Sequence, residues 1–419
     1  MVHKKKRFRI IIIILLFIIY FFLAARPVPR EIVLAPMWVS SLTNNLQPDA
    51  SESLSIDESV FIIDGADNPL LPFTLGSHFG YVDSSGQFAI NRILNNNIYL
   101  SQNMWTEFGA EPSRIEIKNI MEETILNIDN VRGYPVLLDN RIFIFGSEQN
   151  SLSEIDERGN ILWTYEFGAP LTCIDAKAGL LLTGSLDGVI EIFNSSGERI
   201  FYFEPGGSRY EVILGCALSS DGSRIGIICG IDQQRFLLLE RFGNTGGTAS
   251  GVISSDYKVV YHEFLDSGFR RPVRILFIDD DKRIVFERSG GISSYNIRTR
   301  RLMFIPLDGA IYTLEDSGEQ GFLFIVTSSD DDSADHEVFD DQLKKLIGIR
   351  FPQDRWFNFS FGRSSFVTNT DVIFLRAPFK SDDVFLGRMR TAALEHPNSR
   401  SMLVIGGGTV LISFALEEK

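Results

Sequence analysis

A tandem repeat with a spacing of 38 residues constrains the fold more than any other feature of this chain. The first copy runs from residue 136 to residue 168, and the second copy runs from residue 174 to residue 206. Glycines recur at equivalent places, and an aromatic residue recurs near the end of each copy. These repeat positions are Gly146, Gly159 and Trp163 in the first copy and Gly184, Gly197 and Phe201 in the second.

The second copy divides into four apolar runs that turn-forming residues separate. The runs cover residues 170–176, 179–185, 188–194 and 198–204. Short runs joined by glycine-containing turns predict a four-stranded antiparallel meander. A four-stranded unit that repeats about every 40 residues is typical of a β-propeller blade.

The repeat continues towards the C-terminus with wider spacing. Gly230 and Gly243 fall on the glycines of the second copy at an offset of 46 residues. Hairpins are expected at residues 216–229, where Asp221 and Gly222 form the turn, and at residues 274–287. We therefore predict an all-β fold over residues 60–419. It is a β-propeller of about seven four-stranded antiparallel blades, with eight as the alternative count.

The N-terminus carries a membrane-targeting pattern. Residues 1–9 are basic, and residues 10–25 form an uninterrupted apolar run. This pattern predicts one N-terminal transmembrane helix, a signal-anchor, and a cleaved signal peptide is the alternative. The positive-inside rule leaves the N-terminus in the cytoplasm. For a bacterial inner-membrane protein, the propeller would then face the periplasm or the exterior. Residues 26–59 are predicted to be an extended polar linker.

Charge is distributed unevenly along the chain. Residues 1–30 hold seven of the 40 cationic side chains and no acidic ones. The remainder has 33 cationic and 54 acidic side chains, which gives it a net charge of −21. Such an acidic body is poorly suited to phosphate backbones, so no nucleic-acid partner is expected.

The three cysteines are expected to be buried free thiols. Cys173, Cys216 and Cys229 all lie in apolar runs, and none belongs to a C-x-x-C pair. In the predicted hairpin, Cys216 lies opposite Ile227, so a disulfide with Cys229 is not expected.

Candidate catalytic and metal-binding motifs are weak in this sequence. It contains no G-x-S-x-G elbow, P-loop or H-E-x-x-H motif. The acidic stretch at 330–341 lacks the spacing of a calcium loop and is expected to be a solvated insertion. Arg270, Arg271 and Arg274 form a basic spot that we expect at the surface, with an acidic partner or lipid head groups as the alternative. No catalytic residue, metal or cofactor is predicted.

Two motifs resemble those of known propeller families. The segment from Asp156 to Trp163 resembles the D-x-x-T-G-x-x-L-W motif of quinoprotein-type repeats, although Arg158 stands where threonine is usual. Residues 217–228 resemble the S-P-D-G-x-x-I-A hairpin of WD-type and related bacterial propellers. The resemblance implies a closed ring of four-stranded blades. The quinoprotein enzymes also use a quinone, calcium, a catalytic Asp and often a vicinal disulfide, and this chain has no adjacent cysteines.

These patterns favour a membrane-anchored, extracytoplasmic β-propeller that acts as a non-catalytic protein-binding or envelope-assembly scaffold. The protein partner is not identified. The alternative is a propeller enzyme with a site in the central channel, either a quinone-dependent dehydrogenase or a sugar-processing enzyme. An enzyme should bring several carboxylate, histidine or arginine side chains together in one channel pocket.

Overall fold

The structure is a computed structural model. It describes residues 13–15, 17, 20, 32–43, 70–242, 256–307, 309–316, 322–329, 343–350, 377–380, 384–390, 401–407 and 409–418. Of the predicted anchor at 10–25, only Ile13–Leu15, Phe17 and Tyr20 are described, and they are helical. Within the described ranges, no helix has the length and apolar character needed to cross a bilayer.

Strands of the described ranges form eight antiparallel sheets, seven with four strands and one with three. We number these sheets as blades in chain order. Blade 1 contains β2 (Leu71–Leu75), β3 (His78–Val82) and β4 (Phe88–Ile93). Blade 2 contains β5 (Asn97–Leu100), β6 (Met104–Phe108), β7 (Arg114–Asn119) and β8 (Thr124–Asp129). Blade 3 contains β9 (Gly133–Leu138), β10 (Arg141–Gly146), β11 (Ser151–Ile155) and β12 (Ile161–Glu166). Blade 4 contains β13 (Leu171–Lys177), β14 (Leu180–Ser185), β15 (Ile190–Phe193) and β16 (Arg199–Phe203).

The second half of the ring repeats this arrangement. Blade 5 contains β17 (Ile213–Leu218), β18 (Arg224–Cys229), β19 (Arg235–Phe242) and β20 (Asp256–Phe264). Blade 6 contains β21 (Ile275–Ile278), β22 (Arg283–Arg288), β23 (Gly291–Asn296) and β24 (Arg301–Pro306). Blade 7 contains β25 (Ala310–Asp316), β26 (Phe322–Ser329), β27 (Leu343–Arg350) and β28 (Ala377–Lys380). Blade 8 contains β29 (Val384–Arg390), β30 (Ser401–Gly407), β31 (Val410–Glu418) and β1 (Ile32–Ser41).

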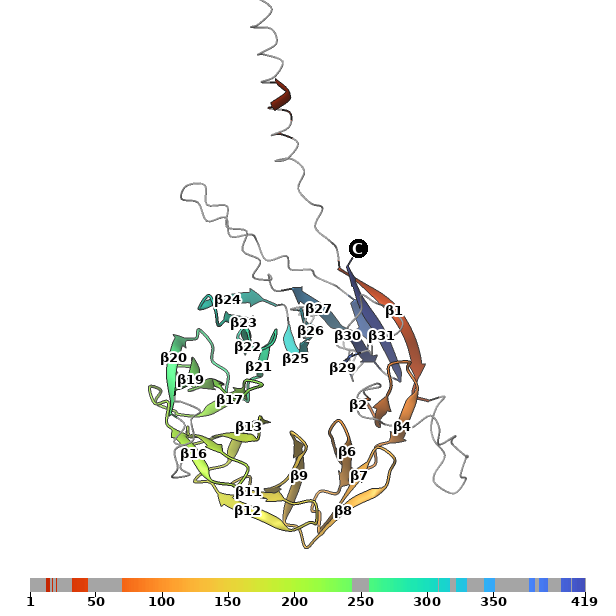
Figure 1. The fold of residues 1–419 in the computed structure, drawn as a ribbon, viewed down its shortest axis with the longest axis vertical. Coiled ribbons are helices and arrows are strands. Elements are labelled where there is room, and N and C mark those ends of the chain that lie inside the picture. Colours follow the sequence, from red (N-terminus) through yellow and green to blue (C-terminus); the bar gives the residue numbers. More distant parts are fainter. Residues whose placement is uncertain are drawn as a thin grey trace, which may run out of the picture.

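The blades are arranged in a ring (Figure 1), and we refer to the centre of this ring as the channel. The first strands of neighbouring blades contact one another, as β13 does with β17 and β25 does with β29. These first strands therefore lie nearest the channel, and the later strands of each blade lie towards the outside. The all-β propeller expected from the 38-residue repeat is confirmed, and the described sheets reach the higher of the two predicted blade counts.

The hydrophobic core lies between the blades. In β18, Ile225 and Ile227 belong to the core between blades 4 and 5, whereas Ile228 belongs to the core between blades 5 and 6. Successive residues of a strand point to opposite faces of its sheet. Because both faces of this blade are covered, its strands are apolar at consecutive positions rather than at alternate ones. This explains why the sequence shows short continuous apolar runs.

Blade 8 joins the two ends of the chain. Its outermost strand, β1, pairs antiparallel with β31, from Ile32 opposite Glu418 to Ser41 opposite Val410. Leu42 follows β1 and is fully buried, and its N–H donates to the carbonyl oxygen of Thr409 over 2.9 Å. The segment 26–59, predicted as a polar linker, thus supplies a propeller strand. The prolines and polar residues of this segment are typical of a linker. Its partner strand, β31, lies at the opposite end of the chain, so the local sequence does not show that residues 32–41 form a strand.

The predicted hairpins are confirmed. The hairpin at 216–229 corresponds to β17 and β18, and Gly222 in its turn has a φ of +67°. Cys216 lies opposite Ile227 as expected, and all three cysteines are free thiols, but only Cys216 and Cys229 are buried, whereas Cys173 is partly exposed. The hairpin at 274–287 corresponds to β21 and β22. The acidic stretch at 330–341 and Gly243 lie outside the described residues.

Candidate binding site in the central channel

The glycines of the repeat lie in turns that an Asp or Asn side chain holds. The Asp156 Oδ1 accepts hydrogen bonds from the backbone N–H groups two and four residues further along, both at 2.8 Å. The Asn194 Oδ1 accepts the equivalent pair at 3.0 and 2.9 Å. Gly159 and Gly197 follow with φ angles of +84° and +77°, which glycine adopts at little cost. Asp and Asn share the acceptor oxygen that this turn needs, which explains how one replaces the other.

Trp163 lies between blades 3 and 4. Its ring stacks on Phe193 with the centroids 6.0 Å apart, and its Nε1 donates to the Glu154 Oε2 over 2.7 Å. A Cβ atom added to Gly197 would lie 2.3 Å from the Trp163 Cγ. Gly197 therefore leaves room for the Trp163 ring of the preceding blade, whereas the equivalent Gly159 faces the main chain of Asn127 and the side chain of Leu126.

The remaining repeat positions also pack inside the blades. The Phe201 ring lies 5.1 Å from the Tyr257 ring, between blades 4 and 5. A Cβ atom on Gly184 would lie 2.5 Å from a methyl group of Ile213, and a Cβ atom on Gly146 would lie 2.1 Å from the Ser151 Oγ. Gly230 has a φ of +84°. These contacts are those of packing and turn formation, and none of them forms a pocket.

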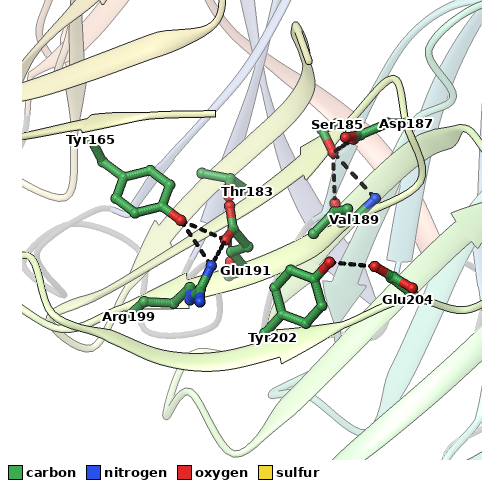
Figure 2. Close-up of polar contacts among 9 residues, drawn as sticks. All are labelled: Tyr165, Thr183, Ser185, Asp187, Val189, Glu191, Arg199, Tyr202 and Glu204. Atoms are coloured by element: carbon green, nitrogen blue, oxygen red, sulfur yellow. Dashed lines mark hydrogen bonds and ion pairs between the residues drawn. The ribbon is translucent and has the colours of Figure 1, made fainter. Parts of the chain in front are cut away.

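A buried carboxylate links blades 3 and 4, as Figure 2 shows. The side chain of Glu191 on β15 is 7% exposed, and its Oε1 accepts hydrogen bonds from the Arg199 Nη1 at 2.7 Å and the Tyr165 hydroxyl at 2.9 Å. The Arg199 Nη1 also donates to the Tyr165 oxygen over 2.9 Å. Burial, and then the hydrogen bond to Glu191, raise the pKa of Tyr165. Its partners satisfy this carboxylate, so its role is structural.

The predicted basic spot is partly bound within the protein. The Arg271 Nη1 donates to the Glu287 Oε2 over 3.0 Å, and its Nη2 pairs with the other oxygen of that nearly buried carboxylate. Arg270, Arg271 and Arg274 are all exposed, as expected for a surface spot, and partial desolvation of the Arg274 guanidinium lowers its pKa. Sequence reasoning missed the buried carboxylates, because a single Glu inside an apolar run is their only signal.

A pocket of about 740 Å³ opens in the channel. Its wall is drawn from β2, β5, β6, β9 and β25, together with the connection between β4 and β5. Blade 3 and blade 7 both contribute to it although they lie on different sides of the ring, so the pocket reaches across the channel (Figure 1). The sequence could not indicate this site, since its residues run from Thr74 to Tyr312 with no shared motif.

Four aromatic rings lie in the pocket wall. They belong to Tyr99, Phe108, Tyr134 and Tyr312. The Phe108 and Tyr134 rings lie 6.2 Å apart and are inclined by 52°. Tyr312 is 38% exposed and is the additional residue of a β-bulge in β25, a feature that redirects a side chain. The aliphatic lining residues are Leu94, Ile98, Pro135 and Val136.

The polar lining of the pocket carries no formal charge. It consists of Thr74, Asn96, Asn97 and the tyrosine hydroxyls, with Gly76 contributing main chain. Asn96 donates through its Nδ2 to the Glu107 Oε1 over 3.3 Å. Burial raises the pKa of Tyr99, so this phenol stays protonated at neutral pH and can donate a hydrogen bond. The arrangement suits the binding of an uncharged ligand.

The ring of four-stranded sheets around a channel defines a β-propeller protein. Residues 1–386 match the model of a β-propeller protein family, so the chain belongs to that family. It is 25% identical over 378 residues to an uncharacterized protein of Treponema pallidum (strain Nichols). The aligned region covers 90% of this chain and 94% of that protein. The crystal structure of BamB from Moraxella catarrhalis is similar with a TM-score of 0.50 and 9% identity, over 91% of this chain and 100% of that one. Identity this low shows the fold alone.

Proposed function

We propose that this protein is a non-catalytic scaffold that binds a protein partner, held at the outer surface of a bacterial cytoplasmic membrane by its N-terminus. The observation that carries the proposal is the chemistry of the channel pocket. Its lining consists of aromatic, aliphatic and amide side chains, together with Thr74 and Gly76. Rigid aromatic side chains with nearby polar groups are the usual anchors of binding interfaces.

The alternative of a channel enzyme finds no support in this pocket. General acid–base catalysis and hydride chemistry need carboxylate, histidine, lysine or similar groups near the reacting atoms. The residues that line the described pocket include no carboxylate, histidine or lysine, and the tyrosine hydroxyls are the acid–base groups among them. In the described ranges, no three His, Cys, Asp or Glu side chains gather where they could hold a metal ion.

The proposed anchor rests on the N-terminal sequence. Basic residues precede the apolar run at 10–25, and this order directs the remainder of the chain across the membrane. We also propose that the repeats are related to those of quinoprotein-type and WD-type propellers. This relation is based on the segment from Asp156 to Trp163 and on the hairpin around Asp221. Fractionation of cells, with carbonate extraction of the membranes, tests the anchor.

Affinity capture from detergent-solubilised membranes tests the binding function. The bait is the full chain with a C-terminal tag, and the proposal expects one partner in stoichiometric amount. Thermal melting of the same protein with a quinone or neutral sugars is measured in parallel. The scaffold function is contradicted if no partner is recovered while a quinone or a sugar raises the melting temperature.

A further inference from the structure

We propose that the channel pocket binds an extended, uncharged, proline-containing segment of the partner protein. This inference rests on the proposed scaffold function and adds the place and the chemistry of recognition. Three features of the pocket support it: four aromatic rings from separate strands, a lining without formal charge, and main-chain groups of β2 that face the pocket.

The rings supply the apolar part of the site. Tyr134 extends from β9, Tyr312 from β25 and Tyr99 from β5, so the rings border the pocket from different directions. Rings that are fixed by strands lose little conformational entropy when they bind. Proline is a matching ligand, because it is apolar and its ring is already rigid. Aromatic-lined grooves are a recurrent way of binding such segments.

The net charge of the chain and the uncharged lining of the pocket both disfavour charged ligands. The chain after residue 30 has a net charge of −21, which disfavours the approach of an anion. The ring faces can attract a cation, but none of the lining residues is acidic, so a full positive charge would leave water without an ionic partner in the wall. The segment that enters should therefore be uncharged.

A peptide fits this wall better than a sugar. Each hydroxyl of a buried sugar must regain a hydrogen bond that it made with water. Apart from the tyrosine hydroxyls, the polar side chains of the lining are those of Thr74, Asn96 and Asn97. A proline residue has no N–H group to satisfy, so a proline-containing peptide makes fewer such demands.

The main chain of β2 can add directional contacts. Leu75 and His78 flank a two-residue turn and pair with each other. Because residues of an antiparallel pair alternate in hydrogen bonding, the N–H and C=O of Thr74 point away from β3. Thr74 also lines the pocket, so these two groups lie where an extended peptide can pair with them.

Selection of peptides on the full chain in detergent micelles tests this inference. The probe is a phage library of random decapeptides. Enriched peptides should contain proline and few charges, and replacement of their prolines by alanine should weaken binding. Binding should also weaken by about ten-fold or more in Tyr134→Ala and in Tyr312→Ala.

The control is Tyr202→Ala, which removes a ring on the outer strand β16, far from the pocket, and should leave binding unchanged. Circular dichroism of each variant checks the fold, and two pocket variants on separate strands guard against a folding defect in one. The inference is overturned by charged or proline-free peptides, by the absence of enrichment, or by a neutral oligosaccharide that binds in the pocket instead. It also fails, with the scaffold function intact, if Tyr134→Ala captures the partner as well as the wild type does.

Discussion

At the scale of single residues, the blades are joined by buried polar contacts as well as by apolar packing. Glu191 receives hydrogen bonds from its own blade through Arg199 and from the preceding blade through Tyr165 (Figure 2). Glu154 is held within blade 3 by Arg141, at 2.6 and 2.8 Å, and by Trp163, whose ring packs against the next blade. Removing one partner from such a group costs more than the bond itself contributes, because the buried charge is left unsatisfied.

The Glu191 contact gives a graded prediction. Arg199→Ala should lower the free energy of unfolding by about 1–3 kcal/mol, since it removes the charged donor of a buried carboxylate. Tyr165→Phe removes one neutral donor and should cost about 0.5–1.5 kcal/mol. Urea denaturation followed by tryptophan fluorescence measures both. Arg158→Ala is the matched control, because Arg158 is exposed, and its effect should stay within about 0.5 kcal/mol. Equal losses in the three variants would contradict a structural role for Glu191.

A second residue-scale prediction concerns Asp221 in the turn of blade 5. Burial alone would raise the pKa of Asp221, but hydrogen bonds from Ser219 and Ser223 lower it from 3.8 to about 2. The folded pKa lies below the unfolded value, so the stabilisation is complete above the unfolded pKa and is lost as the pH falls from about 4 towards 2.

Denaturation midpoints measured between pH 5 and pH 2, at steps of about half a unit, test this linkage. Asp221→Asn keeps an acceptor oxygen in the turn and removes the titrating group. The variant should lose less stability on acidification than the wild type does. Parallel curves for the two proteins would show that Asp221 does not contribute.

At the scale of strands and turns, the repeat preserves what a blade needs in order to close its outer hairpin. The turn between the last two strands needs an Asp or Asn acceptor and a glycine with positive φ. In blade 4 the same glycine, Gly197, also leaves space for the Trp163 ring of the preceding blade. Blade 1 shares this device, because a Cβ atom on Gly86 would lie 2.6 Å from the Trp38 ring of β1.

Substitution of two glycines with similar φ angles distinguishes the cost of backbone strain from the cost of a steric clash with a neighbouring side chain. Gly197 has a φ of +77° and Gly179 a φ of +71°, but a Cβ atom on Gly179 would meet no atom within 4 Å. Gly179→Ala should therefore cost only the strain of a left-handed residue, about 1–2 kcal/mol. Gly197→Ala should cost more, because the Trp163 ring must also move. Urea denaturation measures the difference, and equal costs would mean that the contact with Trp163 is unimportant.

The sequence predicts the blade strands, because they depend on neighbouring residues. It does not predict the contacts between distant parts of the chain. The runs at 170–204 fold as β13–β16, because their alternation with turn residues is encoded within a few positions. Strand β1 was mistaken for part of a linker, because its pairing with β31 depends on the opposite end of the chain. The pocket was missed for the same reason, since it joins residues from blades 1, 2, 3 and 7. Glu191 was missed because its partners, Arg199 and Tyr165, lie on two other strands, one of them in the preceding blade.

At the scale of the whole molecule, the account depends on a ring that the N-terminal strand completes. β1 covers the edge of β31, and Leu42 and Trp38 pack in the core between blades 8 and 1. An uncovered strand edge with exposed apolar side chains destabilises a sheet and promotes aggregation. The segment 32–41 should therefore be needed for folding, independently of the anchor.

Two truncations test this requirement. A chain that lacks residues 1–30 retains β1 and should fold with nearly unchanged thermal stability. A chain that lacks residues 1–43 loses β1 and Leu42, and its melting temperature should fall by roughly 10 °C or more. Differential scanning calorimetry and limited proteolysis make the comparison. Similar melting temperatures for the two truncated chains would contradict closure of the ring by β1.

Our main proposal is that a partner protein binds in the uncharged pocket at the centre of this propeller. Hydrogen–deuterium exchange of the full chain, alone and with the captured partner, tests it most directly. The account predicts slower exchange in the peptides that contain the β2–β3 turn and β9, around Thr74 and Tyr134. Protection confined to the outer strands, such as β12 and β16, or no protection at all, would contradict it.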